Sequence, residues 1–344
     1  LHKSIKKNAM QRKSKKKWPL FLNICRLILS SQRKKNLHMK RLQLAERVCL
    51  GIHVFSMAFG LAGLLLVLPN PEFIASLPPF GMELFGWSMA QGGVGYIILG
   101  AIAVALHAYR YLGLRPLLSF MLPTLALSLS SELLGTSTGF PFGAYHYLSG
   151  LGYKIAGLVP FTIPLSWFYM GFVCYTLARA AIEAVTIAPR WVRQIGAIAI
   201  GSILLTAWDL VLDPAMTQTP YPFWAFDEVG EFFGMPARNI GGWIGTGVVF
   251  MTVASLFQRG DEYVYRREQL GLPVLVYLVN FIFGATITLV ALDSRFVIPT
   301  MLSVAFGVVP AIAFWRLAPS GRVRESVIPA IGLDTTPTLE PVTK

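Results

Sequence analysis

Long apolar segments alternate with short polar ones from residue 42 to residue 318. Each apolar segment has close to the roughly twenty residues that a helix needs to cross a bilayer. We count eight of them, with these approximate bounds: Val48–Leu68, Gly93–Tyr109, Leu117–Leu134, Val159–Ala181, Ile195–Leu212, Gly242–Phe257, Leu272–Leu292 and Val297–Trp315. The pattern predicts an all-α, polytopic membrane helix bundle with about eight transmembrane helices. Only residues 293–296 separate the last two segments, which predicts a tight helical hairpin.

Two flanking stretches differ from this integral membrane domain of residues 42–318. Residues 1–41 form a basic N-terminal tail with fourteen Lys and Arg and no Asp or Glu. Met39 opens MKRLQLAERVCLG, a typical start of a membrane protein, so we interpret residues 1–38 as an over-extended gene model. Residues 319–344 are rich in Pro and Thr and are expected to be a disordered C-terminal tail.

The overall composition agrees with a membrane protein. Hydrophobic residues make up 54% of the 344 residues and charged residues 14%, whereas soluble domains carry about a quarter charged residues. The net charge of +13 belongs to the tail, because removing its fourteen positive charges leaves −1 for residues 42–344. The membrane domain is therefore not expected to bind nucleic acid.

Loop charges predict how the bundle is oriented. Loops on one side carry most of the Arg residues, and loops on the other carry only Lys154, Arg238 and Arg295. By the positive-inside rule, both termini are then cytoplasmic. The ends of the third and fifth spans, with Glu132 and Asp209, fall on the opposite side together with the two long loops, 135–158 and 214–241.

Three acids at membrane depth are the first candidates for chemistry. Asp209 and Asp213 are four residues apart, which places both carboxyl groups on one face of a helix. Glu132 interrupts an apolar helix and needs a polar partner. Acids inside a bilayer are costly and are functional suspects by default. His146 lies in the first long loop and could adjust such an acid.

The acids occur together with many aromatic residues and without signs of cofactor chemistry. No Gly-rich phosphate loop, nucleophile elbow or metal-ligand spacing is present, so we expect no cofactor and no metal. Burial disfavours the charged form of a carboxyl group, which can then donate a proton. Protonating a trisubstituted alkene gives a tertiary cation, which aromatic faces stabilise. This combination suits hydration or cyclisation of an isoprenoid.

Plainer interpretations exist for several of these residues. Aromatic residues near a span end, such as Trp224 and Trp243, are often interfacial belt residues. Asp213-Pro214 could be a simple helix stop. His146 is as consistent with a hydrogen-bonded structural histidine as with a catalytic one.

Four motifs resemble a known family. ELLGTSTGFPFGAYHY, LVPFTIPLSW, WDLVLDPAM and FFGMPARNIGGW look like the membrane carotenoid-biosynthesis hydratases. These include the cyanobacterial γ-carotene 1′-hydroxylase/hydratase of the myxoxanthophyll pathway and the related bisanhydrobacterioruberin hydratase. The resemblance spans roughly residues 46–315 and excludes the basic tail. It implies a multi-pass protein of a bacterial plasma or thylakoid membrane, with a cyanobacterial source favoured.

The resemblance also implies a reaction. Water would add across the 1,2 (1′,2′) double bond of an acyclic ψ end group, as in lycopene or γ-carotene, giving a 1-hydroxy carotenoid of the myxol type. It implies a lipid-soluble carotenoid and membrane lipids as partners, and leaves room for a downstream carotenoid glycosyltransferase. The residue roles are our own inference from the sequence. We predict these catalytic residues: Asp209, Asp213, Glu132 and His146. We predict these substrate-binding residues: Phe142, Tyr145, Trp167, Trp208, Trp224, Arg238, Asn239 and Trp243.

Two other functions stay open at this point. A carotenoid or isoprenoid cyclase would use the same acid chemistry and quench the cation with an alkene. A membrane transporter or carotenoid-binding scaffold would also contain intramembrane acids. Product analysis separates the hydratase from the cyclase by the mass of one water.

Overall fold

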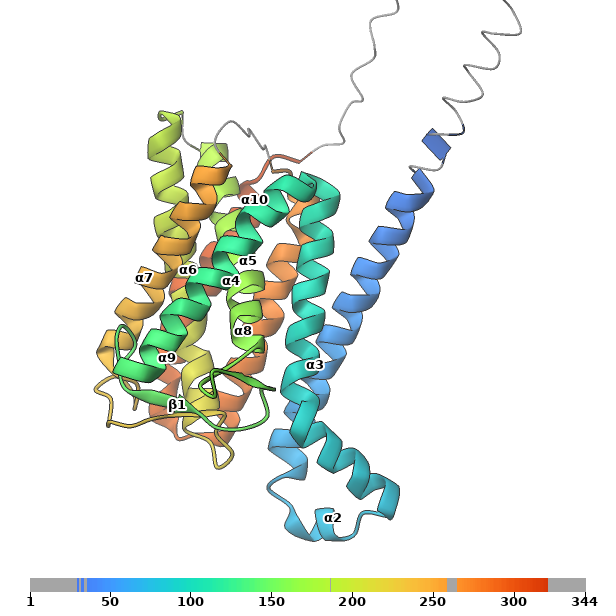
Figure 1. Ribbon diagram of the computed structural model, residues 1–344, viewed down its shortest axis with the longest axis vertical. Coiled ribbons are helices and arrows are strands. Elements are labelled where there is room, and N and C mark those ends of the chain that lie inside the picture. Colours follow the sequence, from blue (N-terminus) through green and yellow to red (C-terminus); the bar gives the residue numbers. More distant parts are fainter. Residues whose placement is uncertain (1–29, 31, 34–35, 186, 259–264, 321–344) are drawn as a thin grey trace, which may run out of the picture.

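The computed structural model describes residues 30, 32–33, 36–185, 187–258 and 265–320. In this part of the chain, eight helices are long and apolar enough to cross a membrane. They stand side by side as a bundle (Figure 1). The prediction of an all-α membrane bundle with eight spans is confirmed. The expectations for residues 1–29 and 321–344 fall outside the described residues.

The spans follow one another along the chain. The first span is Asn36–Val67 and ends in the π-helical turn η1 (Gly63–Val67). The next six are α3 (Pro79–Leu112), α4 (Leu114–Thr138), α5 (Thr162–Val185), α6 (Arg190–Thr217), α7 (Ala237–Phe257) and α8 (Gly271–Ala291). The eighth, Ser294–Leu317, joins η3 (Ser294–Phe296), α9 (Val297–Ser303), η4 (Val304–Val308) and α10 (Val309–Leu317). The short helices α2 (Pro71–Ala75) and η2 (Arg267–Gln269) lie in connections.

Helices α5 and α6 form the centre of the bundle. In their most apolar 18-residue windows, 78% and 72% of the residues are buried, against 11% in the first span. Small residues allow the two helices to approach closely, since a Cβ atom added at Gly201 would lie 3.1 Å from the Cα of Tyr175. Polar side chains on α6 therefore face protein rather than lipid, which lowers the cost of placing carboxyl groups there.

Helix α6 continues through its proline. Pro214 lies inside the helix, which ends at Thr217, so the interpretation of Asp213-Pro214 as a helix stop is wrong. Proline cannot donate the usual backbone hydrogen bond. The helix nevertheless continues for one more turn, in which the hydroxyl group of Thr217 donates to the carbonyl oxygen of Asp213 at 2.7 Å. Both Asp209 and Asp213 thus lie on regular helix.

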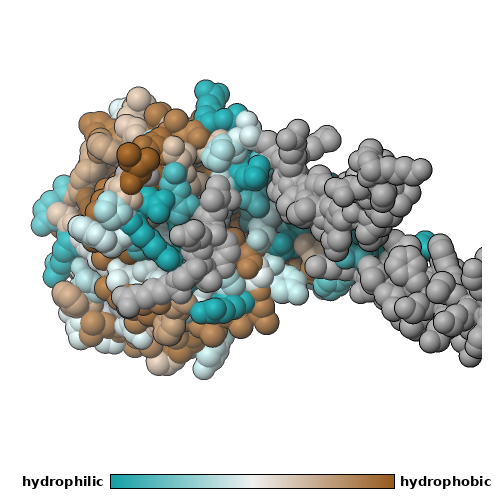
Figure 2. All heavy atoms as spheres, turned by 90° about the horizontal axis from the view of Figure 1, so that it is seen from above, coloured by the Kyte–Doolittle hydropathy of each residue, from teal (hydrophilic) through white to brown (hydrophobic). Residues whose placement is uncertain are grey.

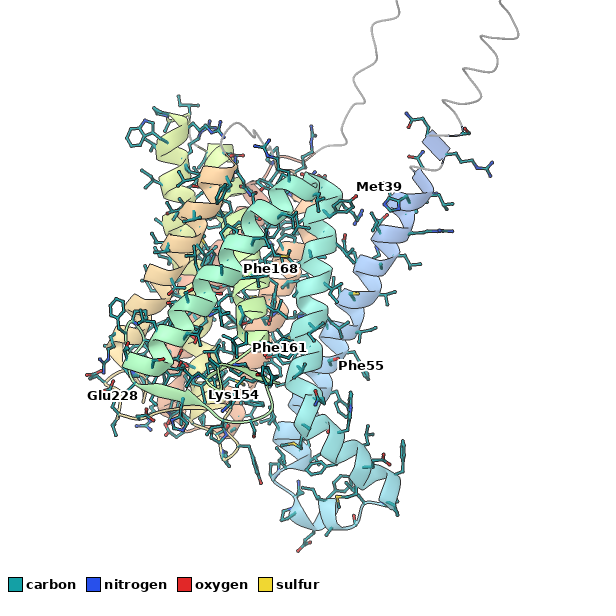
Figure 3. The ribbon with its side chains drawn as sticks, in the orientation of Figure 1. Met39, Phe55, Lys154, Phe161, Phe168 and Glu228 are labelled. Carbon is teal, nitrogen blue, oxygen red and sulfur yellow. The ribbon has the colours of Figure 1, made fainter. Side chains whose placement is uncertain are left out.

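One end of the bundle, which we call the loop end, carries the two long connections. Lys154 and Glu228 lie at this end, and Met39 lies at the opposite end (Figure 3). Strand β1 (Tyr145–Tyr147) of the first connection pairs antiparallel with β4 (Trp224–Phe226) of the second. Strands β2 (Lys154–Ile155) and β3 (Val159–Pro160) form a smaller hairpin. At the opposite end, seen in Figure 2, hydrophilic residues are interspersed with hydrophobic ones.

Candidate functional site

The ribbon formed by β1 and β4 brings the two long connections together over the loop end of α4, α5 and α6. Tyr145 pairs with Phe226, and Tyr147 pairs with Trp224. Side chains alternate between the faces of a strand, so Tyr145 and Tyr147 share one face and His146 takes the other. Accordingly, both tyrosines are buried while His146 is exposed.

Glu132, on α4, accepts hydrogen bonds from three side chains. The hydroxyl groups of Tyr145 and Tyr147 donate to its Oε2, the latter at 2.9 Å. The indole Nε1 of Trp167, on α5, donates to its Oε1 at 2.8 Å. Among the described residues, three donors and no acceptor contact this carboxyl group, which matches the hydrogen-bonding capacity of an ionised carboxylate.

The two tyrosines are themselves held in their protonated form. Burial raises the pKa of both Tyr145 and Tyr147 well above the ordinary value, and the charge of Glu132 raises it further. At neutral pH both phenols therefore carry the proton that they donate to Glu132.

Asp209 and Asp213, on α6, share a single amide group. The Nδ2 of Asn239, at the start of α7, donates to Asp213 Oδ2 at 2.6 Å and to Asp209 Oδ2 at 3.2 Å. The Nε1 of Trp224 donates to the other Asp213 oxygen at 2.8 Å. Two carboxyl groups this close in a dry site cannot both be charged, so one proton between them is the favoured state.

A pocket opens between Glu132 and Asp213. Its lining is mostly aromatic and aliphatic and consists of Glu132, Phe142, Tyr145, Tyr147, Ile163, Ser166, Trp167, Leu212, Asp213, Trp224, Phe226, Asn239 and Trp243. On one wall, Trp167 and Trp243 stack with ring centroids 4.2 Å apart. The pocket thus combines two acids of different surroundings with the faces and edges of several rings.

Glycine makes room for one of these rings. A Cβ atom at Gly242 would lie 2.5 Å from the Phe142 ring, and one at Gly135 would lie 2.8 Å from it. Any larger residue at these positions would displace Phe142 from the pocket. Gly135 of the GTSTG motif and Gly242 of the NIGGW motif therefore act through packing.

Eight of the twelve predicted site residues line the pocket. These are Glu132, Phe142, Tyr145, Trp167, Asp213, Trp224, Asn239 and Trp243. The other four are placed elsewhere. Asp209 lies behind Asn239, and Trp208 packs edge-on against Trp243 with centroids 6.1 Å apart.

The remaining two residues lie on the outer surface of the loop end. His146 pairs with Asp227 at 2.7 Å, and 57% of its side chain is exposed. Arg238 pairs with Glu228, also at the surface. Neither side chain lines the pocket, so this structure gives His146 and Arg238 no contact with a molecule bound there.

Sequence reasoning missed several residues that line the pocket. Tyr147 is the most important of them because it bonds Glu132 directly. The alternation of Tyr145, His146 and Tyr147 is the signal of a short strand that could have grouped the two tyrosines and excluded His146. Ser166, Ile163, Leu212 and Phe226 carry no local signal of their position.

Comparisons with known proteins agree with the motifs. The family model described as carotenoid biosynthesis protein matches residues 92–310, which include every residue of the pocket. The bisanhydrobacterioruberin hydratase of Haloarcula japonica is 33% identical over 166 residues, covering 47% of this chain and 53% of that protein. The match thus spans about half the length of this relative. No solved structure matches the chain. The resemblance inferred from the motifs is confirmed, and the chain belongs to the family of carotenoid biosynthesis proteins.

Proposed function

We propose that the protein hydrates the 1,2 double bond of an acyclic ψ end group of a carotenoid without a cofactor. One observation carries the proposal: Asp213 and Glu132 both line one aromatic pocket, with different hydrogen-bond partners. The name of the Haloarcula japonica relative, a hydratase, supports the same reaction class. The product would be a tertiary alcohol at C1.

Asp213 is the proton donor in this proposal. Asp213 lines the pocket, whereas Asp209 lies behind Asp213. The amide group of Asn239 donates to both and fixes the two carboxyl groups relative to each other. The protonated carboxyl group transfers its proton to C2 of the alkene. The more substituted carbon, C1, then carries the positive charge.

Glu132 balances that charge. Its three donors hold the carboxylate in place, and an anion already fixed in a dry site stabilises a cation without reorganisation. Trp167 and Trp243 line the same pocket and add cation–π stabilisation. Water then captures C1 and completes the hydration.

The position of the pocket fits a long, lipid-soluble substrate. The pocket lies at the loop end of a bundle whose outer surface is apolar, so an end group can enter it while the polyene stays in the hydrocarbon layer. A carotenoid is about as long as the roughly 30 Å hydrocarbon core is thick. We infer lateral entry from the lipid between spans, with lycopene and γ-carotene as the substrates to supply first.

The test is product analysis in a bacterium that makes lycopene or γ-carotene and expresses the full chain. We expect a more polar pigment that is heavier by one water and takes its oxygen from labelled water. An isomer of unchanged mass would indicate a cyclase. Unchanged pigment beside a well-inserted protein would favour a transporter or scaffold, and oxygen derived from dioxygen would also refute hydration.

The first variant to compare is Asp213→Asn. We expect it to lower hydration by at least about a hundredfold, the contribution of a positioned general acid. Asp227→Asn is the matched control, because Asp227 is an exposed acid at the same end that does not line the pocket. Full activity of Asp213→Asn in a folded protein would contradict the assignment.

A further inference from the structure

Two polar atoms beside the pocket have no hydrogen-bond partner among the described residues. They are the indole Nε1 of Trp208 and the Oδ1 of Asp209, at consecutive positions of α6. Both side chains are buried, with exposed fractions of 4% and 0%. Buried polar groups are nearly always paired with protein or with ordered water, so two neighbouring exceptions need an explanation.

Both side chains lie against the same face of α7. Asp209 accepts a hydrogen bond from Asn239 through its other oxygen, and Trp208 packs edge-on against Trp243. Asn239 and Trp243 are four residues apart, hence on one face of the helix, and both line the pocket. The two unpartnered atoms thus belong to residues immediately behind one wall of the pocket.

The two atoms are chemically complementary. Indole Nε1 can only donate a hydrogen bond, and a carboxylate oxygen accepts one. They do not pair with each other, but one water molecule can accept from Trp208 and donate to Asp209. Buried waters make two to four such bonds to groups that lack other partners.

We propose that Trp208 and Asp209 bind the water molecule that becomes the nucleophile. The inference rests on the hydration proposed above and adds the source of the water to it. An aromatic pocket filled by an apolar end group has little room for free water. A water kept behind the wall reaches C1 once the cation has formed.

Asp213, Asp209 and the water account for every proton that moves in this step. Asp213 gives its proton to C2 and becomes a carboxylate. The water oxygen forms the new bond to C1, and one of its protons passes to the carboxylate pair. One alkene and one water become one tertiary alcohol, and Asp213 is protonated again for the next turnover.

The fate of the cation tests the proposal in deuterium oxide. A cation that waits for water can lose a proton from C2 and return to alkene, which then carries deuterium. In the purified full chain in lipid vesicles, we would measure deuterium in recovered substrate relative to hydrated product. Trp208→Phe removes the donor together with part of the indole ring and is expected to raise this ratio about fivefold, the effect of losing one hydrogen bond.

Trp191→Phe is the matched control, since Trp191 is exposed at the other end of the same helix and should leave the ratio unchanged. If Trp208→Phe does not fold, Asp209→Asn is the deciding variant. At nearly constant volume it leaves one carbonyl oxygen for Asn239 and replaces the other oxygen with an NH2 group, which cannot accept, so it should also raise the ratio. An unchanged ratio in a folded variant overturns the water site. Absence of both hydration and exchange in the wild-type protein overturns the proposed function itself, and the water site with it.

Discussion

Buried acids at the two ends of the bundle have opposite surroundings. At the end away from the loops, Glu46 of the first span pairs with Arg110 and lies 3.5 Å from His107, both on α3. At the loop end, no ion pair joins Glu132, Asp209 or Asp213 to a cation in the described part of the chain. Neutral N–H and O–H groups hold these three acids instead.

The difference indicates what each set of acids does. A carboxylate neutralised by an arginine is part of a structural tether, here between the first span and α3. A carboxylate held only by neutral donors keeps its full charge or its proton available to a bound molecule. Acid-to-amide substitutions should therefore lower turnover at the loop end and lower stability at the opposite end.

The largest effect of these substitutions is expected from Glu132→Gln. The change keeps the shape of the side chain and removes the charge that faces the proposed cation. We expect hydration to fall by about a hundredfold or more, the usual effect of losing one preorganised electrostatic contact. Deuterium exchange into the substrate should fall with it, because the cation no longer forms. Hydration at the wild-type rate in a folded protein would show that Glu132 does not balance the cation.

A smaller effect on turnover is expected from Tyr147→Phe. This variant removes one of the three donors to Glu132 and leaves Tyr145 and Trp167 in place. Losing a hydrogen bond to a charged group costs about 1.5–3 kcal/mol, and from the lower end of this range we expect turnover to fall roughly tenfold. The control is Tyr153→Phe, because Tyr153 belongs to the same connection and is 77% exposed. Equal effects of the two variants would contradict a specific role of Tyr147.

Glu46→Gln should leave the chemistry unchanged and weaken the fold. Removing the acid leaves Arg110 without its partner in a buried setting. We expect the free energy of unfolding to fall by about 3 kcal/mol, the lower end for buried pairs, while turnover per folded molecule stays the same. Thermal unfolding and single-turnover assays measure the two quantities separately. Glu72→Gln, at an exposed position of α2, controls for loss of an acid alone.

The spans and the acids were accessible to sequence analysis because their signals are local. Apolar length predicts a span, and the spacing of Asp209 and Asp213 predicts that both lie on one face of a helix. In the structure both accept a hydrogen bond from Asn239. The pairing of β1 with β4 has no such signal, since it joins segments about eighty residues apart. That pairing decides that Tyr147 and not His146 faces the pocket. Likewise, helix spacing alone did not distinguish Asp213, which lines the pocket, from Asp209 behind it.

The order of these groups along the chain has a consequence for biosynthesis. Glu132 enters the membrane before Tyr145, Tyr147 and Trp167, its three donors, have been synthesised. Asp209 and Asp213 likewise precede Asn239. An aspartate in an inserting helix costs at most about 2.5–3.5 kcal/mol, the value at the helix centre, and less toward the end where Asp209 and Asp213 lie. The apolar residues of α6 offset that cost until α7 is synthesised. A nascent chain that ends after α6 therefore exposes unsatisfied acids to the insertion machinery and to quality-control proteases.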